Sequence, residues 1–159
     1  MKEQQPPLPE YVFRGTTYNF RGGGANTIKP YRCYSSSNPI KAAYFAHVCR
    51  GNFIARAVVY IAKTKKLVEA GIIYMINPDP LARAEEEIIW EIKPKDFYKH
   101  CEGYITLKEL KDALRVIGKP LNYAPTYSNL SVACFETQEM SVNEIEKLID
   151  IIYPIIKNA

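Results

Sequence analysis

Cysteine and histidine are scarce in this chain, and neither is spaced for metal binding. Cysteine occurs only at positions 33, 49, 101 and 134, with no CxxC pair, and histidine only at 47 and 100. Structural zinc sites need four such ligands at short, recurring spacings. At 159 residues the chain is also too long and too poor in cysteine to depend on disulfides. We therefore predict free thiols in a reducing compartment and no metal site.

Long apolar runs are also absent. No stretch approaches the ~20 residues that a helix needs to cross a bilayer, and the polar, proline-containing start does not resemble a secretory signal. We expect no membrane span, and export by a route that needs no N-terminal signal peptide. The net charge of +4 favours anionic partners such as phosphates. Because the basic residues are scattered, apart from the run at 63–66, nucleic acid is not an expected partner.

The composition is that of an ordinary globular protein, with 47% hydrophobic and 24% charged residues. A length of 159 residues fits one domain. We expect a flexible lead-in at 1–10, which holds three prolines, and a single domain at 11–159. Within that domain, residues 11–100 form the predicted core and 101–159 a C-terminal helical part. The oligomeric state is left open.

Alternating apolar residues and helix-capping patterns predict an α+β fold. The predicted strands are 11–13, 32–36, 53–62, 72–76 and 88–92, with a short one at 132–135, and a polar connection at 63–71. Asn38 and Pro39 suit the N-cap and first position of a helix that ends near residue 50. Capping boxes at Thr106–Glu109 and Ser141–Glu144 predict helices to about residue 117 and through residue 155.

The first candidate functional motif is Phe13-Arg14-Gly15-Thr16-Thr17. An arginine at the end of a buried strand offers a planar fork that suits a phosphate or diphosphate. The glycine that follows lets a ligand approach the backbone closely. By itself the motif more often means an arginine in a salt bridge and a glycine in a turn.

The second motif is Ser35-Ser36-Ser37, which precedes the predicted helix. Hydroxyls at a strand end can orient a carboxylate or bind a ribose. The simpler role is to cap the helix and fill the turn, and we expect Ser37 to do part of this.

The third motif is Glu85-Glu86-Glu87, which leads directly into an apolar strand. Strand alternation puts Glu85 and Glu87 on one side and Glu86 on the other. Two neighbouring carboxylates raise each other's proton affinity, which costs stability. Such local conflicts are where functional sites are expected.

In this order the three motifs resemble the Arg-Ser-Glu class of mono-ADP-ribosyltransferases. This class includes cholera and heat-labile enterotoxins, Vip2-type and iota-type toxins and many bacterial effectors. The family pattern is aromatic-Arg-Gly, then Ser-Thr-Ser, then Glu-x-Glu, and the resemblance covers 11–100. Ser36 stands where the family has threonine, which keeps the hydroxyl. The resemblance implies a split, mixed β-sheet with flanking helices and an NAD cleft.

The resemblance also implies roles for individual residues. Arg14, Gly15, Thr16, Ser35, Ser36 and Glu87 would bind NAD, which is a substrate. Ser35 would orient Glu87, which would bind the ribose 2′-hydroxyl and stabilise the oxocarbenium-like state. Glu85 would deprotonate the acceptor. A glutamate at that position implies arginine as the acceptor side chain on a target protein, which we expect to be a host protein.

The setting implied is a bacterial effector or toxin that contributes to virulence. It would be made in the bacterial cytoplasm and would act in the cytosol of a host or target cell. An NAD glycohydrolase, with water as acceptor, fits the same motifs, and a non-enzymatic partner-binding domain is a further alternative. Residues 98–109 partly match a calcium-binding loop. Tyr98 and His100 stand where oxygen ligands belong, however, so we predict a helix start there.

Overall fold

The computed structural model describes residues 8–19, 29–49, 57–76, 87–121 and 139–158, with the backbone alone at 47–49 and 87. The elements are, in chain order, β1 (Tyr11–Thr17), β2 (Cys33–Ser36), α1 (Pro39–Cys49), β3 (Ala57–Lys63), α2 (Thr64–Glu69), β4 (Tyr74–Ile76), β5 (Glu87–Trp90), α4 (Pro94–Lys99), β6 (Gly103–Thr106), α5 (Leu107–Val116), α6 (Val142–Ile152) and the 3-10 helix η4 (Tyr153–Ile155). None of the helices in these ranges has the length and apolarity to cross a membrane.

Six strands form one sheet in the order β4-β5-β2-β1-β3-β6, which confirms the α+β class. All five pairings are antiparallel, so the expected mixture of strand directions is not found among the described strands. The physical reason is that β1 lies between β2 and β3. The helical crossover through α1 therefore joins two strands that run in the same direction but do not pair with each other.

The sheet has a narrow junction between β1 and β2. These two strands pair at one register position, where Phe13 lies opposite Ser36. By contrast β1 pairs with β3 over its whole length, from Tyr11 opposite Lys63 to Thr17 opposite Ala57. The sheet therefore consists of two three-stranded halves, β4-β5-β2 and β1-β3-β6, which meet at this junction.

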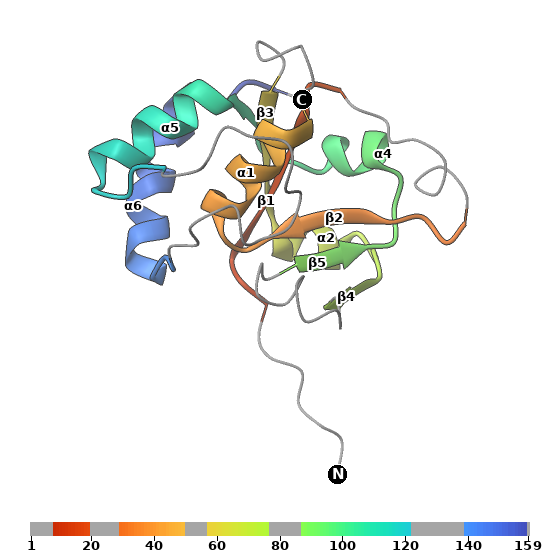
Figure 1. Cartoon of the computed structure of the whole chain (residues 1–159). Helices are drawn as coiled ribbons and strands as arrows, with labels where there is room; N and C mark the ends of the chain where they lie inside the picture. Colours follow the sequence, from red (N-terminus) through yellow and green to blue (C-terminus); the bar gives the residue numbers. More distant parts are fainter. Residues whose placement is uncertain (1–7, 20–28, 50–56, 77–86, 122–138, 159) are drawn as a thin grey trace.

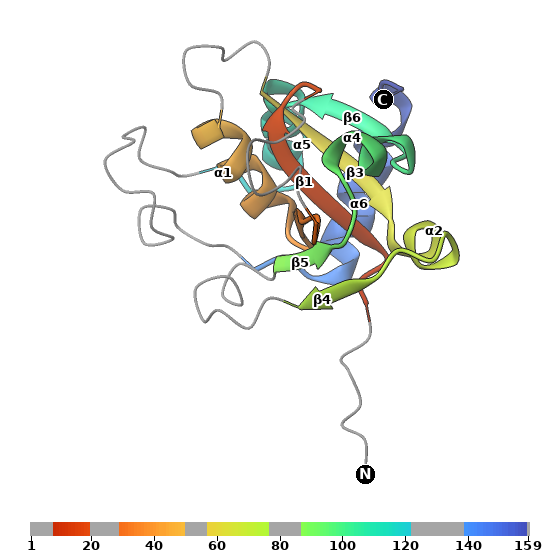
Figure 2. The same cartoon turned by 90° about the vertical axis from the view of Figure 1, so that its right-hand side faces the viewer.

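Each face of the sheet carries its own apolar core. On one face, which we call the α1 face, Phe13, Val59 and Ile61 pack with residues of α1, α5 and α6. On the other, the α4 face, Val12, Tyr60 and Trp90 pack with residues of α2 and α4. Figure 1 shows α1, α5 and α6 on one side of β1 and α4 on the other. Figure 2 shows β1, β3 and β6 side by side, with β4 and β5 at the other end of the sheet.

Local capping signals gave the helix starts correctly. The Asn38 Oδ1 accepts a hydrogen bond from the Ile40 amide at 2.9 Å, so Asn38 caps α1. Both predicted capping boxes are formed, with Thr106 before α5 and Ser141 before α6. The last helix ends at Ile152, earlier than predicted, because Pro154 lacks the amide that an α-helix needs and a 3-10 turn follows instead.

Three expectations about the elements were wrong. The first strand does not end at Arg14-Gly15 but continues to Thr17, because β3 pairs with all seven of its residues. The predicted polar connection at 63–71 contains the helix α2, whose Leu67 is fully buried. Apart from the short strand predicted at 132–135, strands were expected between 11 and 92, yet β6 completes the sheet beside β3, inside the part expected to be helical. The predicted strand at 132–135 lies outside the described residues.

Candidate functional site

Arg14 is a buried residue at the centre of β1. The residue is only 8% exposed. The Nη1 donates a hydrogen bond to the Tyr34 carbonyl oxygen at 3.0 Å, and the Nε donates to the Tyr98 hydroxyl at 3.4 Å. The expected position at a strand end was therefore wrong, since Arg14 is the fourth of seven strand residues.

The guanidinium of Arg14 bridges the narrow junction of the sheet. A continued antiparallel ladder would set Gly15 opposite Tyr34, two residues beyond the Phe13–Ser36 pair. Instead the Arg14 side chain donates to the Tyr34 carbonyl, which a ladder amide would otherwise reach. Arg14 thus links the two halves of the sheet at the point where their backbones separate.

Two tyrosines that the sequence analysis did not single out surround Arg14. Tyr98 of α4 stacks on Tyr60 of β3, with ring centroids 3.9 Å apart and planes 12° from parallel. The Tyr60 hydroxyl in turn accepts a hydrogen bond from the Asn19 amide at 2.9 Å. Tyr98 is 84 residues from Arg14 in the chain, so no local pattern links the two. In the sequence it stood out only as a mismatch in the calcium-loop pattern.

Burial controls the protonation of this tyrosine pair. Desolvation raises the pKa of Tyr98, although the nearby Arg14 guanidinium partly opposes the shift. Desolvation also raises the pKa of Tyr60, against the hydrogen bond from the Asn19 amide. Both phenols therefore stay neutral at neutral pH, and Tyr98 can accept the hydrogen bond from Arg14 as an uncharged hydroxyl.

Ser35 is buried and fixed by two hydrogen bonds on the α4 face. Its hydroxyl donates to the Ile88 carbonyl oxygen at 3.0 Å and accepts from the Trp90 Nε1 at 2.9 Å. Only 3% of Ser35 is exposed, and Trp90 is fully buried. A serine hydroxyl has one proton, which Ser35 gives to a backbone carbonyl. Its evident role is to satisfy the buried indole of Trp90.

Ser36 directs the turn from β2 into α1. Its Oγ accepts a hydrogen bond from the Asn38 amide at 3.0 Å. Ser36 and Asn38 thus each make one hydrogen bond of this turn and helix cap. Ser36 also lies opposite Glu87, the first residue of β5, whereas Ser35 lies opposite Ile88. Residues directly opposite each other share a face of the sheet, so the register associates Glu87 with Ser36 rather than with Ser35.

The predicted site residues fall on three adjacent strands but not on one face. Arg14 and Ser35 belong to the α4 face, as does Thr16, which is 2% exposed. Ser36 shares the α1 face with Phe13, and its register partner on β5 is Glu87. Glu85 and Glu86 lie outside the described residues.

Gly15 is required by the packing of α1. A Cβ added to Gly15 would lie 1.6 Å from the Ala42 carbonyl oxygen and 2.7 Å from the Ala46 nitrogen. The helix backbone therefore already occupies the space that the sequence analysis assigned to an approaching ligand. This close approach lets α1 lie directly on β1 beside the junction.

The described part of the chain contains two free cysteines, Cys33 and Cys101, as expected; Cys49 and Cys134 fall outside the side-chain description. Desolvation raises the pKa of the Cys101 thiol, and the nearby Cys33 adds to the shift. Cys101 is therefore an unreactive thiol at neutral pH. No group of three or more metal-ligating side chains occurs within the described ranges.

Two hollows bounded by described residues lie away from Arg14, and both border α5. One, of about 560 Å³, is lined by residues of β3, β6 and α5; the other, of about 570 Å³, lies where the end of α5 meets α6. Comparison of the whole chain with protein-family models, with curated proteins and with solved structures found no match.

Proposed function

We propose that this protein binds NAD and transfers its ADP-ribose to an arginine side chain of a target protein. The observation that carries the proposal is the convergence of the three motifs on adjacent strands. Arg14 of β1 donates to the backbone of β2, and Ser36 of β2 pairs with Glu87 of β5. These residues are more than 70 positions apart at their extremes, yet they lie on three adjacent strands, β1, β2 and β5.

The residue types fit the chemistry of NAD cleavage. A guanidinium suits the diphosphate or the nicotinamide ribose of NAD. Glu87 would hold the ribose 2′-hydroxyl and stabilise the positive charge that develops as the bond to nicotinamide breaks. Glu85 would accept the proton from the attacking arginine of the target.

The pairing register suggests one change in the assigned roles. Because Ser36 lies opposite Glu87, we assign the positioning of the catalytic carboxylate to Ser36. Ser35, whose proton is given to the Ile88 carbonyl, would hold Trp90 and the β2–β5 pair in place. Arg14 and Ser35 are less than a tenth exposed. NAD would therefore contact only the edge of the β1–β2 junction unless Tyr98 moves away from Arg14.

The experiment is incubation of the protein with NAD labelled in its adenylate part and with cell lysate. Wild-type protein should release nicotinamide and label a protein band, and Glu87→Gln should abolish both. Glu86→Gln is the matched control, because alternation turns Glu86 away from Glu87. Circular dichroism would verify that both variants fold.

The possible results separate the alternatives. Nicotinamide release without a labelled band would identify a glycohydrolase, and no release at all would leave a partner-binding domain. Glu87→Gln with unchanged NAD cleavage would remove the assigned catalytic carboxylate. Labelling of a host lysate would also support the proposed setting, a bacterial effector that acts in the cytosol of a host or target cell.

A further inference from the structure

The hollow beside the start of α5 combines positive charge with an apolar wall. It has a volume of about 560 Å³, and its described lining is Ala57, Thr106, Leu107, Lys108, Lys111, Asp112 and Arg115. Three of these seven side chains are cationic and one is anionic. A volume of this size lies within the ~300–1,000 Å³ of typical small-molecule sites.

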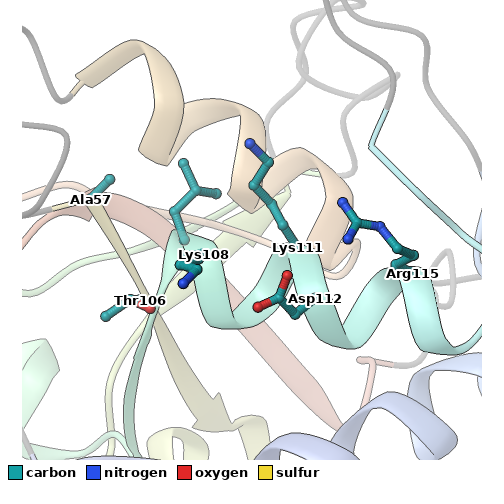
Figure 3. Close-up of a pocket in the computed structure, with 7 residues that line it drawn as sticks. Ala57, Thr106, Lys108, Lys111, Asp112 and Arg115 are labelled. Carbon is teal, nitrogen blue, oxygen red and sulfur yellow. The ribbon is translucent and has the colours of Figure 1, made fainter.

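The cations are arranged along one helix. Lys111 and Arg115 are four residues apart, and Figure 3 shows their side chains rising from the same side of α5. Lys108 and Asp112 lie on the adjoining side of the helix. Like charges at this spacing repel each other and weaken a helix. Such an arrangement beside a hollow favours an anionic ligand that would relieve the repulsion.

The ion pairs of the described chain do not include the charged groups of Arg115 and Lys108. Elsewhere lysines pair with carboxylates, such as Lys157 with Glu109 and Lys119 with Glu144. Neither Lys108 nor Arg115 takes part in an ion pair among the residues that the structure describes. Two exposed cations outside these ion pairs thus border the hollow, which Asp112 also lines.

The hollow is separate from the Arg14 junction. Ala57 lies opposite Thr17 at the far end of β1, three register positions beyond the pair of Arg14 and Tyr60. Helix α5 belongs to the core on the α1 face, whereas Arg14 contacts Tyr98 on the α4 face. A ligand here would therefore not occupy the proposed NAD site.

We propose that this hollow binds a nucleotide. Its phosphates would contact Lys111 and Arg115, and its base would pack against the apolar wall that Leu107 and Ala57 form. Charge-assisted hydrogen bonds from lysine and arginine are the strong contacts that phosphate groups accept. The Thr106 hydroxyl, which accepts from the Glu109 amide as the cap of α5, keeps its own proton to donate. The site does not depend on the proposed transferase activity.

The test is titration of the full-length protein with ADP, followed by calorimetry and by the NMR shifts of amides 106–115. Lys111→Gln with Arg115→Gln should weaken ADP binding by at least about tenfold, which is the effect of losing ~1.4 kcal/mol. The control Lys65→Gln with Lys95→Gln removes two exposed lysines from α2 and α4 and should leave binding unchanged. Arg14→Lys should leave the ADP-induced shifts of amides 106–115 unchanged, because Arg14 is not part of this hollow, and that local signal separates this site from the proposed NAD site.

Three results would overturn the proposal: no saturable shifts at 106–115, wild-type affinity in the α5 double variant, or equal affinity for ADP and inorganic pyrophosphate. The last would show that the apolar wall contributes nothing and that the cations bind any polyanion. Because Arg115 is exposed, Arg115→Gln alone keeps the test valid should the double variant fail to fold.

Discussion

At the scale of single residues, the packing of α1 on β1 depends on the missing side chain of Gly15. We predict that Gly15→Ala destabilises the protein by at least about 2–3 kcal/mol, because the new methyl group would collide with rigid helix backbone. Urea unfolding would measure the loss. Gly71→Ala is the control, since its Cβ would meet nothing within 4 Å and only the positive φ of 78° opposes it. A loss at Gly15 no greater than at Gly71 would contradict the packing argument.

The second prediction for a single residue concerns Ser35 and Trp90. Ser35→Ala would leave the buried indole N–H without its partner and should cost about 1–3 kcal/mol of folding free energy. In a Trp90→Phe background the same change should cost much less, because no indole remains to be satisfied. A double-mutant cycle of unfolding free energies measures this coupling. Additive losses would mean that the hydrogen bond contributes nothing to stability.

Ser35 and Ser36 should affect NAD cleavage for different reasons. A loss of NAD cleavage in Ser35→Ala can arise from a displaced β2–β5 pair rather than from a lost substrate contact. Ser36→Ala retains the hydrogen bonds of Ser35 and tests the residue opposite Glu87. If Ser36 positions Glu87, its replacement should lower the rate of nicotinamide release with little change in the KM for NAD.

At the scale of elements, Glu102 joins the end of β3 and helix α2 to the start of β6. Its carboxylate contacts the Nζ of Lys66 at 2.7 Å and that of Lys63 at 3.3 Å. Desolvation alone would raise the pKa of Glu102, but the hydrogen bonds from Lys66 and Lys63 outweigh it and hold the pKa below its usual value.

The depressed pKa of Glu102 gives a pH dependence of known sign. A carboxyl whose pKa is lower in the folded state stabilises the fold above its unfolded pKa, and this stability is lost as the pH falls through the folded pKa. Glu102→Gln should lower the free energy of unfolding by about 1 kcal/mol at pH 7, a modest loss because the lysines are partly exposed. Near pH 3, where the carboxyl is largely protonated, the same substitution should change the free energy of unfolding very little. Urea unfolding at both pH values checks this. Glu69→Gln, at an exposed pair, should show no such difference.

The capping box of Ser141 and Glu144 stabilises the start of helix α6. Ser141→Ala removes the acceptor of the Glu144 amide and should lower the unfolding free energy by about 1 kcal/mol. Ser141→Asp, which can accept the same hydrogen bond, should restore most of the loss when both are measured by thermal unfolding. Equal stability of the alanine and aspartate variants would show that the cap contributes nothing.

At the scale of the whole molecule, the two cores share one sheet and should unfold together. Leu148 lies in the core of the α1 face, whereas Trp90, the single tryptophan, lies in that of the α4 face. We predict that Leu148→Ala, at a cost of about 2–5 kcal/mol, shifts Trp90 fluorescence and far-ultraviolet dichroism to the same lower midpoint. Transitions that separate would show that the C-terminal helices unfold independently, against the single domain expected at 11–159.

The sequence by itself determined the features that depend on neighbouring residues. The N-cap at Asn38 and both capping boxes were predicted correctly, because the donor and acceptor lie within four positions of each other. Apolar alternation likewise located β1 to β5, although with different ends. The order of the three motifs was also visible, and with it the hypothesis of ADP-ribosyl transfer.

Only the tertiary structure decided which side chains meet. The contact of Arg14 with Tyr98, the requirement for glycine at position 15 and the addition of β6 to the sheet join parts of the chain that are far apart in sequence. Register alone set Ser36 rather than Ser35 opposite Glu87. A one-residue shift in pairing exchanges the two faces of a strand, and here the pairing joins strands whose partners, Ser36 and Glu87, lie 51 positions apart.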